Sequence, residues 1–185
     1  MRLTEKQMEL FEDRQRGGFF SSRTDDPSLV VRVKDDYDGA EPSGNSVAVF
    51  NLLRLAEMTN RDDFRQSADR TLAAMAPRLA AAPFALPQML AACAFHLGHT
   101  RQVILVGERE AADTRALSGA LYAGFVPDRV VLLVDSPQTR RALAERIPAL
   151  ASMEKLDGRA GAYVCRDYAC QLPVSEPEKL AELLQ

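Results

Sequence analysis

Acidic side chains are concentrated between residues 34 and 46, directly before an apolar segment with helical spacing. Asp36, Asp38 and Glu41 supply three carboxylates over six residues of this segment. Carboxylates that share a site can act as general acid and general base when their surroundings separate their pKa values. The spacing therefore makes these three residues the candidates for catalysis.

The same segment carries side chains that could bind a polar ligand. Tyr37 could place its ring or hydroxyl against a sugar, and Ser43 and Asn45 could exchange hydrogen bonds with a sugar or polyol. The alternative interpretation is conformational. Asp and Asn form turns, and Ser43, Asn45 or Ser46 caps the next helix by accepting a hydrogen bond from an unpaired backbone N–H. From spacing alone the conformational interpretation is favoured, because loops of this composition are common.

Cys165 and Cys170 form the candidate redox pair, although four residues separate them and they do not make a CxxC motif. A disulfide between them requires the chain to fold back at the intervening residues. Otherwise both are small packing residues. A zinc site would need two more ligands, and only Cys93, His96 and His99 could supply them, at a spacing that matches zinc motifs poorly. The sequence predicts no metal and no cofactor.

Two further pairs of neighbouring residues are considered, and neither is given a functional role. Arg140 and Arg141 are expected to be solvated charges on a helix. Gly107 and Glu108 directly follow an apolar strand, and ligands of open α/β sheets bind outside the carboxyl ends of strands. Because no glycine-rich phosphate motif accompanies them, the sequence gives little support to a nucleotide site.

The charge balance excludes several classes of function. The 185 residues include 23 basic and 26 acidic side chains, for a net charge of -3, and the cations are scattered along the chain. A protein that follows nucleic-acid phosphates needs a basic face, so no nucleic acid is expected as a partner.

No apolar run reaches the ~18 residues that span a bilayer, so no membrane is expected either. Three cysteines are too few for a disulfide scaffold, and a cytoplasmic protein is expected.

The chain divides near residue 100 into a helical part (1–100) and a part of alternating strands and helices (101–185). In the first part, the spacing of apolar residues predicts helices over 3–15, 47–58, 62–79 and 84–97. Apolar segments at 19–21 and 29–33 flank a polar cluster with turn chemistry and predict a β-hairpin. Short connections between the later helices predict antiparallel neighbours.

In the second part, strands are predicted at 102–106, 130–134 and 162–165, with helices at 114–125, 137–147 and 178–184. Strands that alternate with helices favour parallel βαβ units. The predicted fold is therefore mixed α and β: antiparallel helical hairpins with a β-hairpin, followed by a small βαβαβ unit with a parallel sheet.

Four blocks of sequence carry a resemblance to a known family. They lie at residues 34–46, 101–107, 130–134 and 162–174. In this order they resemble the spermatogenesis-associated protein 20 family of thioredoxin-domain-containing proteins, and the resemblance covers nearly the whole chain. It implies an architecture in which a thioredoxin-like domain is followed by an (α/α) toroid similar to six-hairpin glycosidases and N-acylglucosamine 2-epimerases.

The resemblance implies that this chain corresponds to the C-terminal part of such a protein, in which residues 34–46 would line a sugar-binding funnel. Two functions follow. In the first, the chain is a non-catalytic scaffold that self-associates or docks onto a thioredoxin-like partner domain, with Cys165 and Cys170 as a redox-sensitive pair. In the second, it is part of a carbohydrate-active enzyme that isomerises or hydrolyses a sugar with the carboxylates of Asp36, Asp38 and Glu41.

Overall fold

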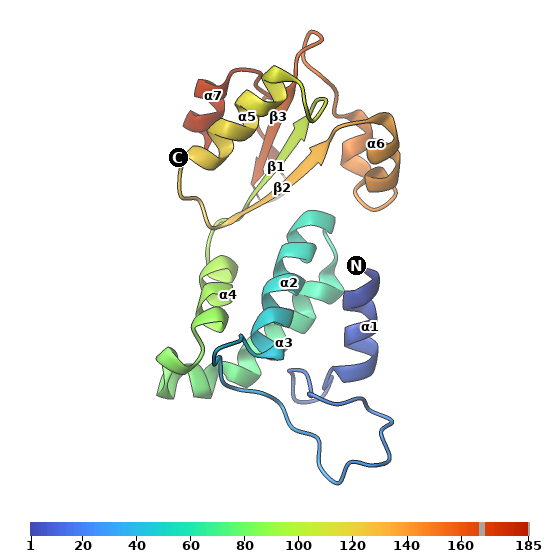
Figure 1. Cartoon of the computed structure of the whole chain (residues 1–185), viewed down its shortest axis with the longest axis vertical. Coiled ribbons are helices and arrows are strands. Elements are labelled where there is room, and N and C mark those ends of the chain that lie inside the picture. The colour runs from blue at the N-terminus through green and yellow to red at the C-terminus, as the bar shows by residue number, and fades with distance from the viewer. Residues whose placement is uncertain (167–168, 185) are drawn as a thin grey trace. The chain divides into compact units, whose positions relative to one another are not determined.

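The computed structural model describes residues 1–166 and 169–184, and the chain forms two compact units, residues 1–97 and residues 98–185. The first unit is helical, and the second is built on a sheet with helices on both faces (Figure 1). The mixed α and β fold expected from the sequence is confirmed. No helix among the described residues is long and apolar enough to cross a membrane.

Four helices make up the first unit: α1 (Arg2–Phe11), α2 (Gly44–Thr59), α3 (Asp62–Ala81) and α4 (Pro87–Leu97). Ser43 begins α2, since its side chain accepts a hydrogen bond from the Ser46 backbone N–H. Asn60 ends α2 in the left-handed conformation, which Asn tolerates better than most residues. The short connection between Thr59 and Asp62 makes α2 and α3 a helical hairpin.

The core of the first unit lies where α2 meets α3 and α4. Alanines of all three helices are fully buried there and allow close approach, while larger side chains fill the remaining space. Phe50 of α2 and Phe95 of α4 pack edge to face, with ring centroids 5.6 Å apart. The buried apolar side chains of these three helices are Ala48, Val49, Leu52, Leu53, Ala56, Phe64, Ala68, Met75, Met89, Ala92 and Phe95.

The β-hairpin expected at 19–21 and 29–33 is not formed. One backbone hydrogen bond, from Ser21 N–H to the Val33 carbonyl, joins the two segments, and neither is a strand. The guanidinium of Arg32 instead lies 3.9 Å from the centre of the Phe20 ring and donates to the Ser22 carbonyl. A two-stranded ribbon with no third strand or helix on its face is marginal in water, which explains the outcome.

The second unit contains a four-stranded sheet in the order β2-β1-β3-β4. Strand β1 pairs parallel with β2, as expected, whereas β3 pairs antiparallel with both β1 and β4. The sheet is therefore mixed rather than wholly parallel. The elements are β1 (Arg101–Val106), α5 (Ala112–Ala123), β2 (Arg129–Val134), α6 (Pro137–Ala144), β3 (Gly161–Arg166), β4 (Ala169–Cys170) and α7 (Pro177–Leu183).

The lengths of the connecting helices explain the two pairing directions. The 12 residues of α5 span about 18 Å, enough to return the chain along a six-residue strand and start a parallel partner. The eight residues of α6 span only about 12 Å. A short 3₁₀ helix at Pro148–Ser152 and a turn with positive φ at Asp157 and Gly158 then lead into β3. Gly161 therefore starts β3 opposite Val106, at the edge where β1 ends.

Each face of the sheet is covered by different helices. Val103 and Leu105 of β1 belong to a cluster with Leu117 of α5 and Leu180 of α7. The alternate residues Ile104 and Val106 belong to a second cluster, against which side chains of α6 and the 3₁₀ helix pack. Figure 1 shows α5 and α7 on one side of the sheet and α6 on the other. Strand β1 is thus buried on both faces, as its apolar sequence predicts.

Candidate functional site

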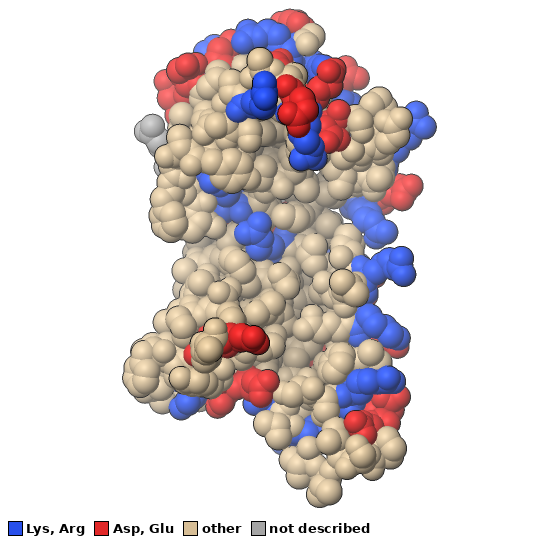
Figure 2. Space-filling view, viewed as in Figure 1, with Lys and Arg blue, Asp and Glu red and all other residues tan. Residues whose placement is uncertain are grey.

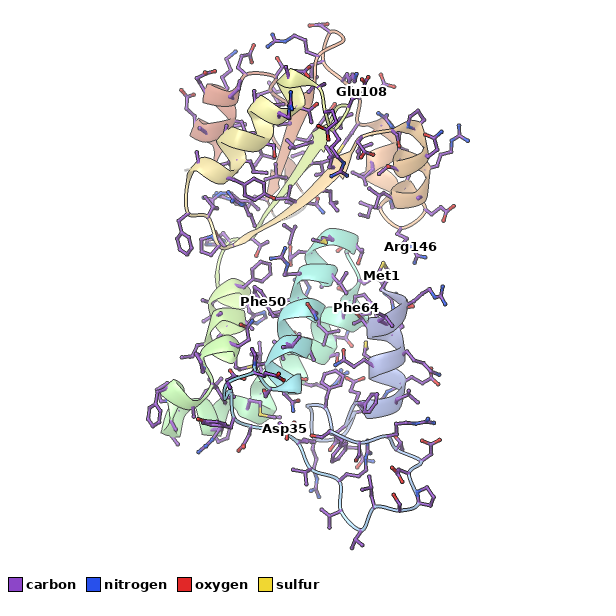
Figure 3. The ribbon with its side chains drawn as sticks, viewed as in Figure 1. Met1, Asp35, Phe50, Phe64, Glu108 and Arg146 are labelled. Atoms are coloured by element: carbon purple, nitrogen blue, oxygen red, sulfur yellow. A yellow bond between two sulfur atoms is a disulfide. The ribbon has the colours of Figure 1, made fainter. Side chains whose placement is uncertain are left out.

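Residues 34–43 have no regular secondary structure, residues 44–46 begin α2, and the segment is fixed at both ends within the first unit. At its start, Lys34 Nζ donates to the Asp13 carboxylate at 2.8 Å and to the Gly17 carbonyl at 2.6 Å. Gly17 has a φ of +75° and lies against the backbone of α3, where a Cβ would be 2.2 Å from the Arg70 carbonyl oxygen. Figure 3 labels Asp35, which belongs to this segment. These contacts hold the start of the segment against the turn that follows α1, and that turn packs on α3.

Asp38 is the buried carboxylate of the segment, with 7% of its surface exposed. Its side chain accepts hydrogen bonds from the backbone N–H of Ser43 at 2.8 Å, Gln88 at 2.9 Å and Met89 at 3.3 Å. Burial alone would raise the pKa of Asp38. The hydrogen bonds from these N–H groups and from the Ser46 hydroxyl lower it by more than burial raises it, so the pKa lies below its ordinary value. The charged Asp38 carboxylate thus links the segment to the first turn of α4 by hydrogen bonds.

Ser43 and Asn45 also bond to the chain's own backbone. The Ser43 hydroxyl accepts from the Ser46 N–H at 3.1 Å and donates to the Ser46 hydroxyl at 2.9 Å. The Asn45 amide accepts from Phe19 N–H at 2.6 Å and donates to the carbonyls of Phe19 and Asp35, each at 3.0 Å. Of the three residues considered as the cap of α2, Ser43, Asn45 and Ser46, the structure has Ser43 in that position. The Asn45 amide instead makes the hydrogen bonds at Phe19 that a neighbouring strand would make.

The other three candidates of the segment face solvent. Asp36 lies 3.6 Å from the Arg78 guanidinium, and its side chain is 58% exposed. Tyr37 and Glu41 are also exposed. A cavity of about 180 Å³ beside the segment is lined by Asp35, Asn45 and phenylalanine side chains, but not by these three residues. The three candidate carboxylates thus occupy different surroundings: Asp38 is buried, Asp36 is paired with an arginine, and Glu41 is in solvent.

Cys165 and Cys170 form a disulfide across the antiparallel pair β3–β4. Cys165 is buried in the core on the α6 face of the sheet, whereas Cys170 is exposed. The third cysteine, Cys93, is a free thiol whose pKa is raised by burial. In the part of the chain that the structure describes, no group of three or more His, Cys, Asp or Glu side chains could hold a metal ion.

A larger cavity lies in the second unit and was not singled out by sequence reasoning. It measures about 530 Å³ and lies where β1 and β2 end. Gly107 and Glu108 after β1 and Asp135 after β2 line it, together with residues of α6 and the approach to β3. Figure 3 labels Glu108 at this edge of the sheet. From the sequence, Gly107 and Glu108 follow a strand but give little support to a ligand site there, and Arg140 and Arg141, which also line the cavity, are expected to be solvated charges.

Charged side chains of both signs surround this edge. On the face shown in Figure 2, Lys and Arg interleave with Asp and Glu over the unit of residues 98–185, and neither sign forms a separate area there. Glu108 pairs with Lys155 at 3.0 Å, and Asp135 pairs with Arg109 at 3.0 Å. Hydrogen bonds from the Thr139 hydroxyl and from Arg109 hold the pKa of Asp135 below its ordinary value.

The fold defines a mixed α and β protein of two units, one helical and one built on a mixed sheet. Over all 185 residues the chain is 37% identical to human spermatogenesis-associated protein 20, and 35% identical to the mouse protein of that name. A Caenorhabditis elegans protein is 30% identical over 90% of the chain. The resemblance to the spermatogenesis-associated protein 20 family is confirmed.

The chain spans only 23% of the length of the human and mouse relatives. The match therefore concerns part of a larger protein. No protein-family model and no solved structure matches the chain significantly.

Proposed function

We propose that this chain is a non-catalytic interaction module that packs against other parts of a larger protein. The observation that carries this proposal is an exposed aliphatic run at residues 29–33. Val30 is 99% exposed, and Leu29, Val31 and Val33 are exposed as well. Four aliphatic side chains within five residues of surface are typical of a segment that another surface covers.

The size of the relatives supports another part of the same polypeptide as the surface that covers the run. The matching segment is 23% of the human protein, so most of that polypeptide lies outside it and is available as a neighbour in the same chain. Residues 31–39 have no regular secondary structure, and β-branched side chains such as Val30, Val31 and Val33 suit pairing with the edge strand of another sheet. In isolation the run is uncovered, and we expect the chain to self-associate through it.

The contacts of the segment 34–46 support a non-catalytic role. Asp38 and Asn45 direct their hydrogen bonds to backbone groups of their own unit. A carboxylate that accepts several backbone N–H bonds is stabilised in its charged form and is a poor general acid near neutral pH. The segment then acts as a brace that fixes the exposed run relative to α2 and α4.

Light scattering during size-exclusion chromatography over a hundredfold concentration range tests the proposal. The unmodified chain should gain mass with concentration, and the Val30→Asp/Val31→Asp variant should remain monomeric. Phe125→Asp is the matched control, since Phe125 is 92% exposed but lies in the other unit, and it should associate like the unmodified chain. A monomer at every concentration, or equal loss of association in the control, would count against the proposal.

A second candidate is carbohydrate chemistry, and the exposed groups of the same segment favour it. Asp36, Tyr37 and Glu41 combine two carboxylates with an aromatic ring at the surface, a composition suited to sugar hydroxyls and a sugar face. Titration of ¹⁵N-labelled protein with N-acetylglucosamine, followed by NMR, tests it. Shifts at this segment that disappear in Asp36→Asn/Glu41→Gln support sugar binding, and unchanged spectra up to millimolar sugar argue against it.

The cysteine pair is proposed as a thiol–disulfide exchange site for a thioredoxin-like partner domain. A thiolate of the partner attacks the exposed Cys170 sulfur, a mixed disulfide forms, and Cys165 leaves as a thiolate that takes up a proton. The second thiol of the partner then releases Cys170, so the partner is oxidised and this chain is reduced. The support is the asymmetry of the pair, with one sulfur open to attack and the other in the core.

A further inference from the structure

In the second unit, the connection that leaves β1 and the connection that leads to β3 lie on opposite faces of the sheet. From β1 the chain passes through α5 on one face of the sheet to β2, and from β2 it passes through α6 on the other face to β3. Strands β2 and β3 lie on opposite sides of β1. Two connections that run over opposite faces of a sheet leave a crevice at the carboxyl end of the strand between them. Ligands of open α/β sheets bind in such a crevice.

The cavity of about 530 Å³ lies at this place and is within the size range of pockets that hold small ligands. Its floor includes Gly107, the residue directly after β1. A Cβ at Gly107 would be 2.3 Å from the Thr114 hydroxyl oxygen and 2.7 Å from the Ala160 Cβ, so only glycine fits. The close approach of α5 and the residue before β3 thus keeps the end of β1 free of a side chain.

The carboxylates at the two strand ends of the cavity form ion pairs, whereas two of its arginines do not. Glu108 is engaged by Lys155 and Asp135 by Arg109, so both carboxylates at the strand ends are neutralised. Arg140 and Arg141 of α6 also line the cavity, and neither guanidinium forms an ion pair with any residue that the structure describes. Arg140 is half-buried, so its charge is less screened by water than that of a fully exposed arginine.

We propose that this cavity binds the phosphate group of a small phosphate ester through Arg140 and Arg141. Adjacent guanidinium groups match the geometry and charge of a phosphate, which accepts paired N–H bonds from each. Glu154, at the rim, forms no ion pair with any described residue. A carboxylate there accepts hydrogen bonds from neutral hydroxyl groups and repels a second anion, so the ester is expected to carry hydroxyls rather than another acidic group.

The test is an NMR titration of the ¹⁵N-labelled full chain with glycerol 1-phosphate, inorganic phosphate, sulfate and glycerol. Glycerol 1-phosphate should shift amides at residues 107–108 and 135–141 and bind more tightly than inorganic phosphate or sulfate, and glycerol should have no effect. Arg140→Gln/Arg141→Gln should lower the affinity by about tenfold or more, because both charge-assisted contacts are lost. Arg115→Gln, an exposed arginine of α5, is the control and should bind as the unmodified chain does.

The spectrum of each variant without ligand shows whether the second unit remains folded, so a loss of binding is not confused with unfolding. Three results would overturn the proposal: shifts at other residues, equal and weak binding of all three anions, or a double variant that binds as well as the unmodified chain. None of them bears on the interaction module, which rests on the first unit.

Discussion

Asp38 shows how a residue with catalytic chemistry can serve conformation. Its carboxylate joins the turn before α2 to the first turn of α4, where Gln88 lies 50 residues from Asp38 in sequence. A buried acceptor that pairs with several backbone donors is expensive to remove, because each donor then loses its partner away from water. Asp38 is therefore expected to contribute to the stability of the first unit.

Replacement of Asp38 by Asn should lower the free energy of unfolding of the first unit by about 1.5–3 kcal/mol, the usual range for hydrogen bonds to a charged group. The amide keeps the volume but offers one acceptor atom in place of two. Asp36→Asn is the matched control, since Asp36 is exposed and its contact with Arg78 is long, and it should change stability by less than about 0.5 kcal/mol. Urea denaturation followed by circular dichroism measures both; equal effects of the two substitutions would refute the assignment.

The stability difference between the unmodified chain and Asp38→Asn should also depend on pH. Because the folded pKa of Asp38 lies below the ordinary value of 3.8, its contribution is fully present above that value and is lost as the pH falls through the folded pKa. The difference should thus be constant between pH 5 and pH 7 and shrink below about pH 4. A difference that stays constant down to pH 2 would contradict this.

Sequence reasoning anticipated part of this site and missed the rest for a physical reason. A cap depends only on the next three residues, so the local sequence narrows it to Ser43, Asn45 or Ser46, and the structure has Ser43. The partners of Asp38 at Gln88 and Met89 depend on how α2 and α4 pack, which no local pattern encodes. The sequence therefore does not distinguish a buried carboxylate that stabilises the fold from a catalytic one.

At the scale of elements, Gly107 is where β1, α5 and the approach to β3 come closest. Gly107→Ala should destabilise the second unit by about 1–3 kcal/mol, because the added methyl group overlaps Thr114 and Ala160. Gly119→Ala is the control: it lies within α5 with open space around it, and should stabilise by about 0.5–1 kcal/mol through helix propensity. Thermal unfolding of both variants measures the contrast, and the same sign for the two would show the packing account to be wrong.

The disulfide belongs to the hairpin of β3 and β4. It closes a loop with a sequence separation of 5, and the chain-entropy relation gives about 2 kcal/mol for so short a loop. The unmodified chain should therefore lose about that much stability in excess dithiothreitol, and Cys165→Ala/Cys170→Ser should not respond to it. Cys93→Ala, which keeps the pair, is the control and should respond as the unmodified chain does. An unchanged stability on reduction, with both thiols shown to be free, would argue that the pair has no structural role.

Element types were easier to predict than their pairing. The apolar strands predicted at 102–106 and 130–134 and the helix predicted at 114–125 follow from periodicity, and the structure has them as β1, β2 and α5. The direction of β3 depends on how far α6 carries the chain back along the sheet, and the sequence suggested a longer helix than the eight residues observed. The hairpin at 19–33 failed for another reason: its segments have strand-like composition but no neighbouring sheet or helix to stabilise a ribbon.

At the scale of the whole molecule, the two units differ in how their apolar surfaces are covered. In the unit of residues 98–185, α5 and α7 cover one face of the sheet and α6 the other. In the unit of residues 1–97, the aliphatic run at 29–33 has no cover. The human relative contains about four times as much chain, and in our proposal this run is the surface that other parts of such a protein would cover.

Amide hydrogen exchange of the isolated chain at two concentrations, one hundredfold above the other, tests the interaction module most directly. If the run mediates association, the amides of residues 29–33 should exchange more slowly at the higher concentration, and Val30→Asp/Val31→Asp should abolish that difference. Equal exchange of residues 29–33 at both concentrations, or slowing confined to the unit of residues 98–185, would contradict the account.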